Sequence, residues 1–79
     1  MSDLKDELER VVRLMVDYPD DVELVADDRG GTTHFELHVA DDDLGKVIGR
    51  QGRTARAMRS LLAARGARDG RRYELQIID

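Results

Sequence analysis

A glycine-rich segment near the middle of the chain carries the residue types best suited to chemistry. It runs from Leu44 to Thr54 (LGKVIGRQGRT) and contains a G-x-x-G turn at Gly49 to Gly52. Glycines let the backbone approach a phosphodiester closely, and free N–H groups at the start of a following helix favour an anion. Two arginines add guanidinium donors that hold phosphate oxygens in forked geometry, and a lysine adds a point charge. The segment therefore predicts a phosphate-binding loop.

A nucleic acid also needs room for its bases beside such a loop. Val47, Ile48 and the strand expected at residues 33–39 are predicted to wall an apolar groove in which unstacked bases lie. The predicted nucleic-acid-binding set is Lys46, Val47, Ile48, Gly49, Arg50, Gln51, Gly52, Arg53, Thr54 and Arg56.

The first half of the chain predicts the elements that support this loop. Apolar residues recur at helical spacing from Leu4 to Met15 and predict a helix, which Pro19 cannot continue. Alternating residues at 22–26 and 33–39 predict two strands, joined as a hairpin by the turn-rich segment 27–31.

The second half predicts two helices and a strand. Asp41 to Asp43 offers an N-cap for a short helix ending at Gly49, and the other residues of this acidic run are expected on the solvated surface. A longer helix with an apolar stripe follows Gly52 and is expected to break between Gly66 and Gly70. The alternation at 73–77 predicts a last strand.

The element order is therefore αββααβ, and it predicts an α+β fold. A strand, a two-helix crossover and a second strand pair as parallel neighbours, with the hairpin strand on the other side. The result is a three-stranded mixed sheet with three helices on one face, in a single domain over residues 1–79.

Charge is distributed very unevenly along the chain. The formal net charge is −4. From Leu44 to Arg72, however, nine basic residues stand against one acidic residue, giving +8, while the remaining residues carry −12. Such segregation is expected where one face meets a polyanion, although a salt-bridged surface is an alternative.

Several other classes of protein are disfavoured. The chain has no cysteine, which excludes disulfides and thiolate metal sites, and it has neither a signal-like start nor an apolar run long enough to span a membrane. We expect a cytoplasmic, membrane-free protein without a cofactor. His34, Glu36 and His38 share one strand face, but polar residues on a half-buried strand explain them better than a metal site. No catalytic constellation is present, so an enzyme is not expected.

Segment 47–52, Val-Ile-Gly-Arg-Gln-Gly, resembles the KH-domain signature V-I-G-x-x-G with a basic residue in the loop. The element order resembles the type II KH arrangement of bacteria. The whole chain is similar to the KhpA family of stand-alone bacterial KH proteins, particularly at Tyr18 to Val22 and Gly45 to Ala55. It departs from that family chiefly in its preference for arginine over lysine and in its many aspartates.

The resemblance implies binding of single-stranded RNA, about four nucleotides per domain, by an adaptor or RNA-chaperone-like regulator. It also implies a homodimer, or a heterodimer with a larger Jag-type protein, KhpB. The stretch Leu61 to Ala64 is a candidate dimer seam, and a wide core face explains it equally well. A protein-interaction module with incidental RNA contact therefore stays an alternative, and single-stranded DNA is not excluded as a ligand.

Overall fold

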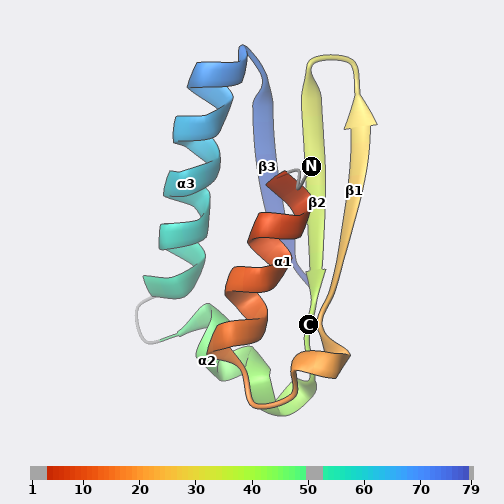
Figure 1. Cartoon of the computed structure of the whole chain (residues 1–79), viewed down its shortest axis with the longest axis vertical. Coiled ribbons are helices and arrows are strands. Elements are labelled where there is room, and N and C mark those ends of the chain that lie inside the picture. Colours follow the sequence, from red (N-terminus) through yellow and green to blue (C-terminus); the bar gives the residue numbers. More distant parts are fainter. Residues whose placement is uncertain (1–3, 50–52, 79) are drawn as a thin grey trace.

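The computed structural model describes residues 4–49 and 53–78, and its elements follow the predicted order αββααβ (Figure 1). In chain order these are α1 (Leu4–Met15), η1 (Pro19–Asp21), β1 (Glu23–Arg29), β2 (Thr32–His38), η2 (Asp41–Asp43), α2 (Leu44–Ile48), α3 (Arg53–Asp69) and β3 (Arg72–Ile77). Within the described ranges, no helix combines the length and apolar character that crossing a bilayer requires.

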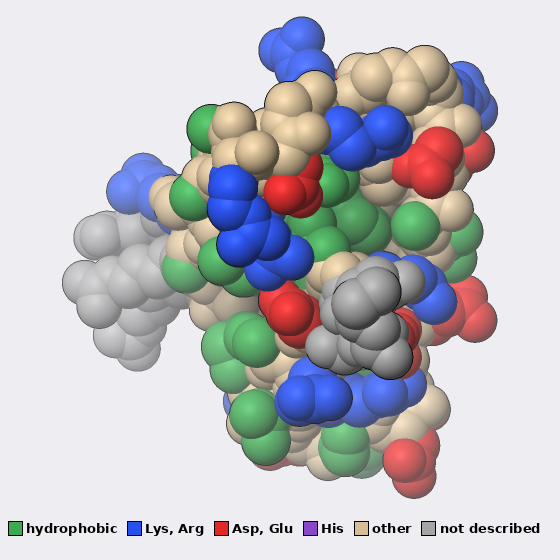
Figure 2. All heavy atoms as spheres, turned by 45° about the horizontal axis from the view of Figure 1, so that its top comes forward, with side chains coloured by type: hydrophobic (Ala, Val, Ile, Leu, Met, Phe, Trp, Pro, Cys, Tyr) green, Lys and Arg blue, Asp and Glu red, His purple; other side chains and the backbone are tan. Residues whose placement is uncertain are grey.

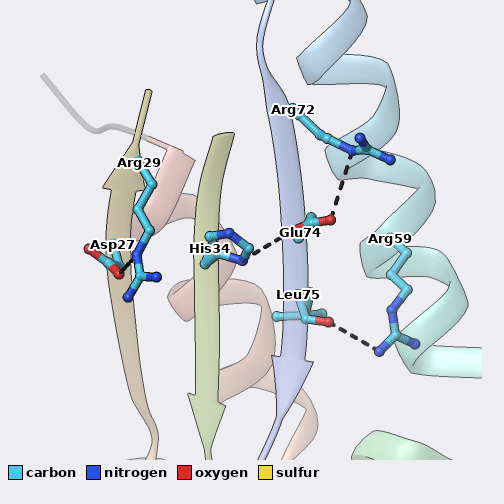
Figure 3. Close-up of polar contacts among 7 residues, drawn as sticks. All are labelled: Asp27, Arg29, His34, Arg59, Arg72, Glu74 and Leu75. Carbon is cyan, nitrogen blue, oxygen red and sulfur yellow. Dashed lines mark hydrogen bonds and ion pairs between the residues drawn. The ribbon is translucent and has the colours of Figure 1, made fainter. Parts of the chain in front are cut away.

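Three strands form one mixed sheet in the order β1-β2-β3. β1 pairs antiparallel with β2, with Ala26 opposite Phe35, and β2 pairs parallel with β3, with Phe35 opposite Leu75. The helices lie against one face of this sheet, and the opposite face is open, as Figures 1 and 3 show from two sides. The predicted type II KH arrangement is confirmed.

The core lies between the helices and the covered face of the sheet. One side chain per turn of α1 reaches it, namely Leu4, Leu8 and Val12, which fits the helical period of an amphipathic helix. The other core side chains come from the sheet and from α2 and α3: Val22, Leu24, Phe35, Leu37, Val47, Met58, Leu62 and Leu75. This layer fixes the positions of α2, α3 and β3 relative to one another.

α3 ends between Gly66 and Gly70, where the sequence predicted a break. It runs through Gly66 and ends at Asp69, just before Gly70, whose φ is 67°. A Cβ atom on Gly66 would lie 2.5 Å from the carbonyl oxygen of Arg71, so only glycine permits this close approach. Gly66 therefore sets how tightly α3 packs on the returning chain and does not end the helix.

Several apolar residues of the first helix and of the segment after it are exposed. Val11 and Met15 on α1 are 42% and 39% exposed, and Tyr18, after α1, is 48% exposed. In the stretch Leu61 to Ala64 only Leu62 is buried, and the other three side chains face solvent. The interpretation of that stretch as a wide core face is therefore wrong.

Asp43 differs from the prediction for the acidic run at 41–43. The predicted helix N-cap is absent: Asp43 makes no side-chain capping bond to α2 and is completely buried. Its Oδ1 accepts the main-chain N–H of Asp17 at 3.0 Å, and its Oδ2 accepts that of Tyr18 at 3.0 Å. The carboxylate therefore joins the exit of α1 to the start of α2.

Candidate nucleic-acid interface

α2 and α3 meet at a sharp corner that begins at Gly49. This residue has φ 67° and ψ 170°, a backbone conformation that residues with a Cβ atom rarely adopt. Its N–H donates to the carbonyl of Gly45 at 2.8 Å. α3 begins at Arg53. The predicted binding residues Arg50, Gln51 and Gly52, and the side chain of Arg53, lie outside the described residues.

A groove of about 420 Å³ opens beside this corner, between the helices and β3. Its lining is apolar except for two arginines and one glutamine: Ile48, Ala55, Arg56, Arg59, Leu75, Gln76 and Ile77. The sequence placed the strand at residues 33–39 in this wall, and that prediction is wrong. β2 is the central strand, flanked on both sides, so the edge strand β3 forms the wall instead.

Three predicted binding residues are placed differently from one another. Ile48 is 45% exposed and lines the groove, whereas the Val47 side chain is completely buried in the core and cannot contact a ligand. Thr54 lies on another side of α3, facing α1, and its Oγ1 donates to the main-chain carbonyl of Lys46 at 3.3 Å. Val47 and Thr54 therefore support the corner from within.

Lys46 is held by a carboxylate of the α1 exit. Its Nζ donates to Oδ2 of Asp17, and both side chains are about half exposed. The hydrogen bond that Lys46 donates to Asp17 raises the pKa of Lys46 above its usual value and favours the charged ammonium. An anion that approaches Lys46 thus meets an ammonium already shared with Asp17.

Two arginines on the groove side of α3 are not neutralised in this way. Arg56 and Arg59 are three residues apart, so they share one face of the helix. Among the described residues neither forms an ion pair. Arg59 was missed as a site residue by the sequence, although its three-residue spacing from Arg53 and Arg56 was the available signal.

Most other cations of the basic segment are paired with acids. Arg65 lies 3.0 Å from Glu7, Arg71 lies 3.2 Å from Asp28, and Arg68 and Arg72 have carboxylate neighbours at 3.4 and 3.8 Å. Figure 2 shows basic and acidic side chains interleaved on the end of the molecule where α3 and β1 end. The salt-bridged surface therefore accounts for this part of the segregated charge, and the two arginines of the segment that form no ion pair within the described ranges, Arg56 and Arg59, line the groove.

The open face of the sheet carries polar side chains, as predicted for His34, Glu36 and His38. His34 Nδ1 lies 3.0 Å from Oε1 of Glu74 on the neighbouring strand, as Figure 3 shows. Residues 4–49 and 53–78 contain no group of three or more potential metal ligands. These histidines lie outside the lining of the groove.

A second, more apolar groove of about 340 Å³ lies between α1 and α3. Three of its lining residues are the exposed apolar side chains Val11, Met15 and Leu61. The rest of the lining consists of Leu8, Thr54, Ala57 and Met58. The two grooves lie on different faces of α3. We call them the strand-edge groove, beside β3, and the helix groove, beside α1.

Helix-corner-helix geometry at Gly49, set on an αββααβ sheet, defines a type II KH domain. The family model described as "KhpA/KhpB, KH domain" matches residues 5–77, so the chain belongs to the KhpA/KhpB family of KH domains, which is not a family of enzymes.

Curated relatives match over nearly their whole length. A protein of Halalkalibacterium halodurans is 47% identical over 96% of this chain and 100% of its own. One of Mycobacterium leprae is 53% identical over 94% of this chain and 89% of its own, and one of Streptomyces coelicolor is 46% identical over 96% and 95%. All three carry the name "RNA-binding protein KhpA".

Proposed function

We propose that this chain binds single-stranded RNA in the cytoplasm and that residues 1–79 form a single KH domain. In this proposal the loop at residues 49–52 holds the RNA backbone and the bases lie in the strand-edge groove. The observation that carries the proposal is that groove itself, apolar along Ile48 and Ile77 and flanked by Arg56 and Arg59 without carboxylate partners among the described residues. The names of the relatives support RNA as the ligand.

The chemistry of the groove suits an unpaired strand better than a duplex. Apolar side chains accept the faces of unstacked bases, and the arginines at the rim neutralise the phosphates between them. Glycine at position 49 leaves the corner free of side-chain bulk where the backbone of the RNA would pass. About four nucleotides fill such a site in KH domains.

The test replaces the loop cation and its neighbour by acids, as Arg50→Asp with Gln51→Asp. We expect this variant to remain folded and to lose at least about tenfold in affinity for a short single-stranded RNA, because two carboxylates repel phosphate. Fluorescence polarisation measures the loss, with DNA of the same sequence as a competitor. For the wild type, the logarithm of affinity should fall with the logarithm of salt concentration by about 0.7 per phosphate neutralised.

The matched control is Arg10→Asp with Arg13→Gln on α1, which removes the same total charge away from the loop. We expect it to retain RNA affinity within about twofold, apart from a small long-range effect of charge. Equal losses in the loop variant and the control would mean that net charge, and not the loop, decides binding. RNA binding by the loop variant at wild-type strength would refute the proposed site.

A second candidate function is favoured by the helix groove. Val11, Met15 and Leu61 are each about 40% exposed and lie together along one apolar depression, and such surfaces mark sites of protein association. The proposed occupant is a second copy of this chain or the KH domain of a KhpB/Jag-type protein. In this case RNA contact would be secondary, and sedimentation with and without RNA distinguishes the two functions.

A further inference from the structure

Arg59 spans the strand-edge groove from one wall to the other. It starts on α3, and its Nη2 donates to the main-chain carbonyl of Leu75 on β3 at 3.2 Å (Figure 3). The contact is partly buried, and it joins an arginine on the α3 side of the groove to the opposite wall, β3. Arg56, on the same face of α3, has no such bond among the described residues.

The carbonyl of Leu75 belongs to the free edge of the sheet. β3 is the outermost strand, so alternate residues turn both their N–H and their C=O away from β2. Leu75 is one of these residues, because its carbonyl meets Arg59, while the N–H of Ile78 turns inward to the carbonyl of Leu37 at 2.9 Å. A base lying in the groove would meet the outward groups of Leu75.

An outward pair of this kind offers one acceptor and one donor to a base. Adenine matches such a pair, because its N6 amino group donates and its N1 accepts. With Arg59 bound to the carbonyl, however, a guanidinium already takes one of the two lone pairs of that oxygen, so a second donor must share it, and the groove presents guanidinium donors beside it. Cytosine has two adjacent acceptors, O2 and N3, that fit a forked guanidinium, and it is also smaller.

We propose that Arg59 selects the base in the strand-edge groove, favouring cytosine over adenine at the position beside Leu75. This inference rests on the proposed RNA-binding function and adds a base preference to it. The amino group of adenine has to share the Leu75 carbonyl with the guanidinium or displace it. Cytosine can be bound by the guanidinium while that bond persists, since Arg59 has further N–H donors.

The experiment compares affinities for two eight-nucleotide RNAs, oligo(C) and oligo(A), by fluorescence polarisation at neutral pH. Three proteins are measured: wild type, Arg59→Met and Arg56→Met. Methionine keeps an unbranched apolar stem and removes the charge, so both variants lose the same electrostatic attraction. We expect wild type to prefer oligo(C), and Arg59→Met to shift the ratio of the two affinities toward oligo(A) by about fivefold to tenfold, the typical weight of one hydrogen bond.

Arg56→Met is the matched control and should weaken both RNAs equally, leaving their ratio within about twofold of wild type. Arg59→Lys keeps the charge without the planar fork, and should shift the ratio in the same direction while retaining more total affinity. This second variant also provides the test if Arg59→Met does not fold.

The outcomes separate the inference from the function on which it rests. If wild type binds both RNAs but no Arg59 variant changes their ratio, the inference is overturned and RNA binding stands. An equal shift in Arg56→Met would also overturn it, because charge alone would then account for the preference. If wild type binds no single-stranded RNA, the proposed function fails and the base preference falls with it.

Discussion

Asp43 shows how one side chain can hold together the parts of this small protein. It is completely buried, and its two carboxylate oxygens accept the N–H groups of Asp17 and Tyr18, about 25 residues earlier in the chain. The next turn of the chain carries Lys46, which binds Asp17 in return. The start of the loop-bearing corner is thereby anchored to the exit of α1.

Replacing Asp43 by alanine should lower the free energy of unfolding by about 2–3 kcal/mol, because two N–H groups lose charged acceptors at once. Asp43→Asn keeps one carbonyl acceptor and should cost less than alanine. Urea denaturation monitored by circular dichroism measures both variants. The control is Asp42→Ala, an exposed neighbour, which should change stability by less than about 0.5 kcal/mol. Equal effects at positions 42 and 43 would contradict the anchoring role.

The side chains of α3 lie in three different environments. Met58 and Leu62 enter the core, Arg56 and Arg59 face the strand-edge groove, and Leu61 faces the helix groove. This division explains why its apolar stripe is less regular than that of α1. Its packing on the returning chain depends on the missing side chain at Gly66.

Gly66→Ala should destabilise the protein although alanine is the better helix former. The helix propensity of alanine favours it by about 1 kcal/mol, but the new Cβ would lie 2.5 Å from the carbonyl oxygen of Arg71, and overpacking of this kind costs about 1–3 kcal/mol. Thermal unfolding measures the net change. The exposed neighbour change Ala67→Gly isolates the propensity effect and should cost about 1 kcal/mol. A higher melting temperature for Gly66→Ala would refute the packing argument.

The elements of this fold could be predicted because each carries a local signal. The helical period from Leu4 to Met15 and the alternation at 33–39 and 73–77 require no knowledge of neighbours. Features that depend on distant partners were missed. Asp43 has its partners in the segment that follows α1, and the groove strand was misassigned because only the strand order shows that β3 is the edge.

The exposure of Leu61 likewise depends on how α1 crosses α3, which a single stripe cannot reveal. Arg59 could have been included in the site, since its spacing was visible in the sequence. What the sequence could not reveal is its bond to Leu75, because that contact needs the sheet edge to lie across the groove.

Self-association through the helix groove gives a prediction for the assembled protein. Leu61→Glu places a carboxylate in the apolar depression, so we expect it to shift a wild-type dimer to monomer in analytical ultracentrifugation. Leu14→Glu introduces the same charge on α1 at a position that is 81% exposed and outside that lining. This control should keep the wild-type oligomeric state.

RNA affinity per chain should change by less than about twofold in both variants beyond the effect of one added charge, because the strand-edge groove lies on another face of α3. A wild type that stays monomeric at high micromolar concentration would contradict self-association through this groove. It would leave the RNA-binding proposal in place.

The edge strand β1, on the side of the sheet opposite β3, limits how copies of this protein can associate. β1 carries Glu23, Asp27 and Asp28 against one basic residue, Arg29, so a junction between two β1 strands would bring two net negative strands together. Such repulsion disfavours a continuous six-stranded sheet and the fibre-like stacking that bare strands promote. Copies at high concentration are therefore directed to meet through their helical sides, which disfavours polymerisation through the sheet edge.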